Sequence, residues 1–152
     1  STYTLYANMP SDSKGGIDMA ELKKAAIVAA KWWTEKISHP TLDDFNNGDR
    51  TSDSSFFIMI LAHMDALEHA ATKEQLNKFS ERLAQKISDE LDSKDELYLD
   101  CDYGPCAVLG EIAEEVRIDI SLFPYKRAMW VSPESVKIKD GYGAPIKSVY
   151  PE

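Results

Sequence analysis

The residues best suited to covalent chemistry lie in one short turn, Asp100-Cys101-Asp102-Tyr103-Gly104-Pro105-Cys106. Proline suits the first position of a helix, so Pro105 predicts a helix start with Cys106 in the first turn. Free backbone N–H groups and the positive end of the helix dipole favour a thiolate there. Cys106, assisted by Tyr103 or by a distant histidine, is therefore a candidate nucleophile or redox group.

Other features of the same turn oppose catalysis. Neighbouring Asp100 and Asp102 would raise the pKa of a thiol and oppose its activation. Cys101 stands five residues before Cys106, which does not match the Cys-x-x-Cys redox spacing, although a regulatory disulfide between them stays open. The sequence favours ordinary half-buried structural cysteines. The histidines that could act as a base are remote along the chain, at positions His39, His63 and His69.

Charge is the second chemical feature. The chain has 26 acidic and 17 basic residues, a net charge of -9. Eleven acidic and two basic residues lie between Asp89 and Asp119, so this stretch carries the whole net charge. Such a block is typical either of a solvated face or of a docking surface for a basic protein. The predicted binding residues are Asp100, Asp102, Glu111, Glu114, Glu115 and Asp119.

Two patterns resemble metal sites and are better explained otherwise. Asp65 and His69 have the i, i+4 spacing of helical metal ligands, but the same spacing gives a routine surface pair and no third ligand is evident. The run 43–49 resembles a calcium loop, yet Phe45 falls where an oxygen ligand belongs and Ser54 falls where a bidentate glutamate is required. We therefore expect no metal and no cofactor.

The elements that must position these residues change in period along the chain. Apolar residues recur at helical spacing in the first part and alternate in the last part. The pattern predicts four helices. They run from a capping box at Asp18 and Glu21 to Ile37, from 52–55 to about Ala71, from Thr72 to Leu91 and from Pro105 to Val116. It also predicts strands at Thr2–Ala7, Glu96–Asp100, Arg127–Val131, Ser135–Lys139 and Ile146–Tyr150.

Two expectations concern packing. The second helix begins with seven apolar residues, 56–62, on all its sides, which predicts a central helix surrounded by protein. Trp32 and Trp33 are about 100° apart around the first helix, so one should enter the core while the other lies at its rim.

These observations predict one α+β domain spanning residues 1–152. Its N-terminal half, with three helices, packs on a strand-turn-helix unit and a C-terminal antiparallel β-meander. We expect a small, acidic, cytoplasmic, non-enzymatic protein, monomeric or homodimeric, that binds a basic protein partner through residues 89–119, as an inhibitor or immunity-type protein does. The charge argues against direct nucleic-acid binding, and no apolar run is long enough to cross a membrane. The alternative is a small enzyme or redox protein that uses Cys106.

Overall fold

The computed structural model describes residues 19–48 and 53–151, which form an α+β architecture. The predicted strand Thr2–Ala7 lies outside the described residues. The α-helices are α2 (Lys24–Ser38), α3 (Asp53–Glu68), α4 (Lys73–Leu91) and α5 (Ala107–Glu115), and short 3-10 turns form η2 (Met19–Glu21), η3 (Leu42–Phe45) and η4 (Ile120–Leu122). The strands are β1 (Leu97–Cys101), β2 (Arg127–Ser132), β3 (Ser135–Asp140) and β4 (Ile146–Tyr150).

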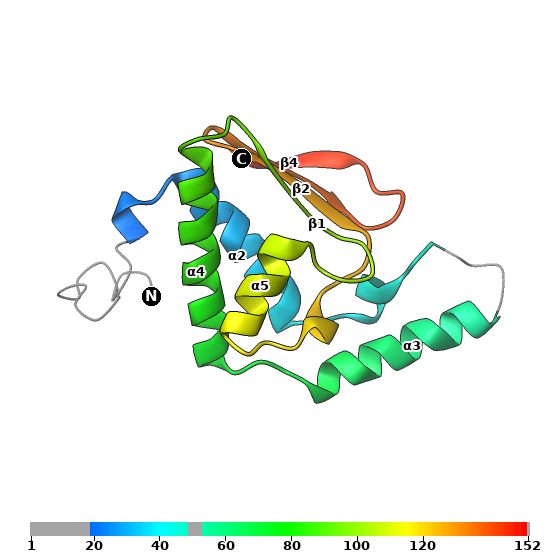
Figure 1. Ribbon diagram of the computed structural model, residues 1–152. Coiled ribbons are helices and arrows are strands. Elements are labelled where there is room, and N and C mark those ends of the chain that lie inside the picture. The colour runs from blue at the N-terminus through cyan, green and yellow to red at the C-terminus, as the bar shows by residue number, and fades with distance from the viewer. Residues whose placement is uncertain (1–18, 49–52, 152) are drawn as a thin grey trace.

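The sheet confirms the predicted meander and adds β1 to its edge. Its order is β1-β2-β3-β4, with every neighbouring pair antiparallel. Leu99, Met129 and Ile138 align across three strands and are fully buried. Because side chains alternate between the two faces of a strand, this register turns one face of the sheet toward the helices. Helices α2, α4 and α5 lie on that side (Figure 1).

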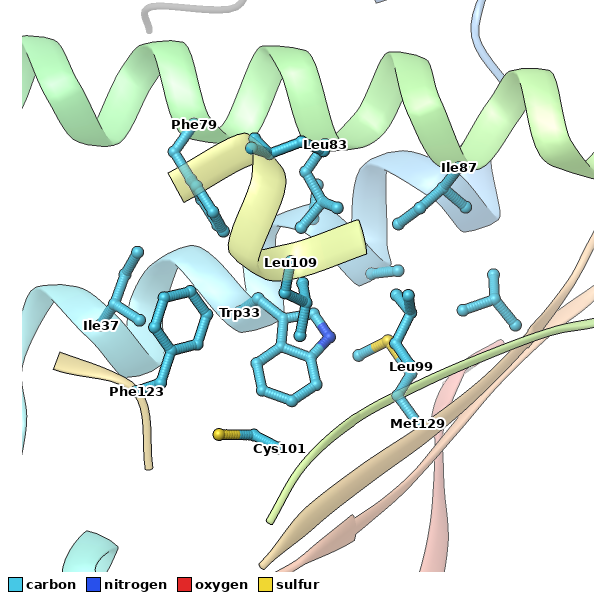
Figure 2. Close-up of a cluster of buried hydrophobic side chains, with 14 of the residues drawn as sticks. Trp33, Ile37, Phe79, Leu83, Ile87, Leu99, Cys101, Leu109, Phe123 and Met129 are labelled. Carbon is cyan, nitrogen blue, oxygen red and sulfur yellow. The ribbon is translucent and has the colours of Figure 1, made fainter. Parts of the chain in front are cut away.

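Helices α2 and α4 pack closely because α2 presents small side chains. Its alanines at positions 25, 26, 29 and 30 are fully buried. Trp33 follows them into the core, where its ring packs near Phe123 and Phe79 contacts Phe123 in turn (Figure 2). Trp32 is only partly buried and meets the edge of Trp33, with the ring centroids 5.0 Å apart. The prediction of one core and one rim tryptophan is confirmed.

Helix boundaries are right at α4 and wrong at two other places. Thr72 and Gln75 form the predicted capping box of α4. Asp18 of the box expected at the first helix lies outside the described residues, and α2 itself starts later than predicted. It begins after Lys23, whose backbone is extended and whose N–H donates to the Ser88 hydroxyl on α4. Helix α5 starts after Pro105, since Pro105 forms a β-bridge with Cys101 and remains outside the helix.

The expectation that the second helix is central is wrong. Helix α3 extends away from the sheet and from α4, and packs mainly on η3 and η4 (Figure 1). Phe56, Phe57 and Ile58 are each more than half exposed, whereas Ala66 is fully buried. The physical reason is that α2, with its alanine surface, already fills the space between α4 and the sheet. No helix in the described ranges is both long and apolar enough to span a membrane.

A buried arginine attaches η3, and with it α3, to the sheet. Arg127 on β2 is 4% exposed and Asp44 on η3 is equally buried. The guanidinium donates to Asp44 Oδ1 (2.8 Å), to the Asp44 carbonyl (3.2 Å) and to the Tyr125 carbonyl (2.7 Å). Its Nε donates to Asp140 Oδ1 at 2.7 Å, and Asp140 also pairs with Lys36 on α2. This network joins a helix, a 3-10 turn and two strands.

Candidate binding surface around helix α5

The turn between β1 and α5 is fixed by backbone hydrogen bonds. The Cys106 N–H donates to the Asp100 carbonyl at 2.9 Å, and the Lys126 N–H donates to the Asp102 carbonyl at 2.9 Å. The Lys126 ammonium also pairs with the Asp102 carboxylate at 2.6 Å. These contacts hold the start of α5 beside the end of β1 and the entry to β2.

Cys101 lies in the core rather than at a reactive surface. Its side chain points into the buried cluster with Trp33 and Leu99 (Figure 2), and it is 1% exposed. Burial, with smaller contributions from the nearby Cys106 and Asp100, raises the pKa of the Cys101 thiol to about 12. A thiol with that pKa stays protonated at neutral pH and is a poor nucleophile.

Cys106 is the N-cap of α5 and is partly buried. Both cysteines are free thiols. Tyr103, the predicted assisting group, is 56% exposed; its ring packs against Tyr125, and the Lys126 ammonium lies 4.5 Å from its centroid.

Among the described residues, the hydrogen bonds and ion pairs of the three histidines do not involve Cys106. His39 contacts Ser38, and His63 lies against η3 with its Nε2 3.2 Å from the Pro40 carbonyl. His69 Nδ1 lies 3.5 Å from the Asp65 carboxylate. Among the described residues, no group of three or more potential ligands could hold a metal ion. Asp65 and His69 form a pair at the surface of α3 and its C-terminal end.

Helix α5 turns its apolar side inward and its glutamates outward. Leu109, Ile112 and Ala113 are buried, while Glu111 and Glu114 are exposed. Residues three apart lie on the same helix face, so the carboxylates of Glu111 and Glu114 are neighbours. In the described part of the chain neither forms an ion pair with a basic side chain.

The eleven carboxylates of residues 89–119 divide into two groups. Basic side chains pair with one group, in the contacts Lys23–Asp92, Lys86–Glu90, Lys94–Glu90, Lys126–Asp102, Arg82–Glu115 and His69–Asp119. Hydrogen bonds from Lys94 and Lys86 hold the pKa of Glu90 below its usual range. The second group, which forms no ion pair within the described residues, consists of Asp89, Asp95, Glu96, Asp100, Glu111 and Glu114.

The structure thus separates the six predicted binding residues. Asp102, Glu115 and Asp119 are each engaged with a basic side chain from outside residues 89–119. Asp100, at the end of β1, and the two outward glutamates of α5 remain free of such partners among the residues described. Sequence counting could not find the neutralising lysines and arginines, because they approach from distant parts of the chain. We call Glu111 and Glu114, the outward carboxylates of α5, the α5 acidic surface.

A hollow of about 300 Å³ lies at the outer face of the sheet, at the end of β1. Its lining includes the acidic residues Asp100 and Asp102, the basic residues Lys126 and Lys139, and Tyr142. Its charges are mixed, so it does not select for either sign of ligand.

A comparison with protein-family models gives no match, and a comparison with curated proteins gives none either.

Proposed function

We propose that this protein is a non-enzymatic binding protein that docks on a basic protein through the α5 acidic surface. The observation that carries the proposal is the outward side of α5, where Glu111 and Glu114 stand one turn apart without a basic partner among the described residues. An inhibitor or immunity-type protein that occupies the basic surface of its target would work in this way. We place it in the cytoplasm, where its free thiols would remain reduced.

The position of these glutamates does not serve helix stability. Like charges at i, i+3 repel each other along a helix. Glu114 also lies in the last turn of α5, where the negative end of the helix dipole disfavours a carboxylate. The last turn contains no basic residue. A basic partner would relieve both unfavourable interactions, which supports a role in binding.

The chemistry of the surface selects the partner. Carboxylates about one helical turn apart, roughly 5 Å, can each accept a hydrogen bond from a guanidinium or an ammonium group. A net charge of -9 repels nucleic acid and anionic lipid, and attracts a basic protein over distances of about a Debye length. The expected partner therefore presents clustered arginine or lysine side chains.

The alternative function is that of a small cysteine-dependent enzyme. It is favoured by the place of Cys106 at the N-cap of α5, where its side chain caps no backbone N–H. The described histidines and Tyr103 contact other groups, so the base and the assisting acid would have to come from the substrate or a partner.

Affinity capture from the native host, followed by binding titrations with the captured protein, tests the proposal. Glu111→Gln/Glu114→Gln should weaken binding by about tenfold or more, equivalent to at least about 1.4 kcal/mol. The control Glu35→Gln/Glu134→Gln removes the same charge from exposed sites on α2 and in the β2–β3 turn. Since rim charges act mainly at long range, this control should change affinity by less than about threefold.

Salt dependence and one cysteine variant complete the experiment. Affinity should fall as ionic strength rises, and Cys106→Ser should bind as tightly as the unmodified chain. Equal losses of affinity in the test variant and the control variant would mean that only the net charge of the protein matters. That result would refute binding through the α5 acidic surface. If Cys106→Ser lost binding while Glu111→Gln/Glu114→Gln bound as tightly as the unmodified chain, the result would support the cysteine-dependent enzyme instead.

A further inference from the structure

Helix α3 carries an apolar surface that residues 19–48 and 53–151 leave open. Its C-terminal half rests on η3 and η4, with Ala66 fully buried and His63 beside Phe45 at a ring separation of 6.0 Å. The large side chains on its other sides are exposed by 48–59% each, namely Phe56, Phe57, Ile58, Leu61, Met64 and Leu67. In Figure 1 the helix extends away from the body of the molecule.

The spacing of these side chains defines one stripe. Phe57, Ile60, Met64 and Leu67 follow intervals of three, four and three residues, which is the a/d pattern of paired helices. The stripe lies on a different side of the helix from Ala66, which faces the body. We call these four residues the α3 seam, and Phe56 and Leu61 flank it.

The exposed area matches what a dimer needs. Five of the six exposed side chains lie on the seam side, Phe56, Phe57, Leu61, Met64 and Leu67, because Ile58 points away from it. Each presents on the order of 100 Å², about half of what a large apolar side chain buries. Together they expose about 500 Å² per copy, within the range of the largest apolar patches on monomers. Two such surfaces in contact would bury about 1,000 Å², the minimum expected of a specific protein interface.

We propose that α3 pairs with α3 of a second copy of this chain in an antiparallel arrangement, forming a two-fold symmetric dimer. The α3 seam is self-complementary, since Phe57 of one copy would meet Leu67 of the other, and Ile60 would meet Met64. Helix dipoles also oppose each other favourably when helices run antiparallel. The body is attached near the C-terminal half of α3, so this arrangement places the two bodies, each with a net charge of -9, at opposite ends. A parallel pair would bring them together.

Sedimentation equilibrium of the full chain over micromolar concentrations tests the pairing. The unmodified protein should have twice the monomer mass of 17.1 kDa. Phe57→Lys/Met64→Lys should raise the dissociation constant by about 100-fold or more, because a lysine at an a position opposes pairing. Its far-UV circular dichroism should stay unchanged, since both side chains are already exposed in the monomer.

A matched control separates the α3 seam from exposed apolar surface in general. Ile146 on β4 is 58% exposed, so Ile146→Lys introduces the same charge at a comparable apolar site. This variant should remain dimeric. A monomeric unmodified chain at all concentrations, a dimer that persists in the seam variant, or a dimer dissociated by Ile146→Lys would overturn the proposal. Binding of the monomer to phosphatidylcholine vesicles through α3 would also overturn it.

Disulfide trapping tests the antiparallel orientation in a Cys106→Ser background. Phe57→Cys/Leu67→Cys should form covalent dimers upon oxidation, because the two positions meet across the interface. Phe57→Cys alone should not, since the equivalent positions of an antiparallel pair lie about 15 Å apart along the axis, too far for a disulfide. Trapping by Phe57→Cys alone would instead show a parallel pair. The dimer does not depend on the α5 acidic surface, and Glu111→Gln/Glu114→Gln should leave it intact.

Discussion

Replacing Arg127 by methionine should be among the most destabilising single changes in this protein. The substitution removes four hydrogen bonds and leaves the Asp44 carboxylate, 4% exposed, without its buried cation. Breaking a buried ion pair on one side typically destabilises by about 3–5 kcal/mol. Because whole proteins are stable by only about 5–15 kcal/mol, the variant should lose a large part of its total stability.

Urea unfolding followed by circular dichroism measures this loss. With a denaturant slope of about 2 kcal/mol/M, the midpoint should fall by about 2 M. The stability of Arg127→Lys should lie between that of the unmodified protein and that of Arg127→Met. An ammonium group retains the charge but lacks the planar fork that reaches both carboxylates. An exposed ion pair provides the comparison: Arg82→Met, which removes the partner of Glu115, should change stability by less than about 1 kcal/mol.

A loss of less than about 1 kcal/mol in Arg127→Met at an unchanged denaturant slope, the range typical of exposed pairs, would show that this buried network contributes little to stability. Equal destabilisation by Arg82→Met would show that burial does not determine the effect.

Three further predictions follow from single residues. Iodoacetamide at pH 8.5 should modify the partly exposed Cys106 but not Cys101, whose pKa burial raises to about 12, as peptide mass spectrometry can show. A hydrogen bond to the Asp65 carbonyl and the charge of Asp119 raise the pKa of His69 above 6.5, so Asp119→Asn should lower it in an NMR titration. The stabilisation linked to His69 should be complete below the unfolded pKa and be lost as pH rises through the folded pKa. Phe79→Ala, at a fully buried core position, should destabilise by about 3–5 kcal/mol in thermal or urea unfolding.

Local sequence patterns predicted the structure correctly where interactions between residues close in the chain determine it. The capping box at Thr72 and Gln75 satisfies backbone groups within the same turn, so its residue types identify the start of α4. Short β-prone runs separated by turn residues likewise predict β2, β3 and β4, whose pairing needs only neighbouring strands.

The surface and the tertiary arrangement depend on contacts that no local pattern contains. Lys126 and Arg82 neutralise carboxylates that a count along the chain leaves unpaired. Helix α3 is the other case: a helix apolar on every side indicates that protein surrounds it, but the pattern does not say whether that protein is the same chain. We propose that a second copy supplies the missing contacts.

The order of strands in the sheet has a consequence for how the chain folds. Strands β2, β3 and β4 are joined by short turns, so their pairing closes only small loops, and hairpins of this kind form in about 1–10 μs. Strands β1 and β2 are neighbours in the sheet, but α5 and η4 separate them along the chain, so their pairing closes a longer loop. We therefore expect a three-stranded C-terminal unit to form first and the docking of β1 with α5 to limit the rate of folding. The α5 acidic surface would then be among the last parts of the molecule to assemble during folding.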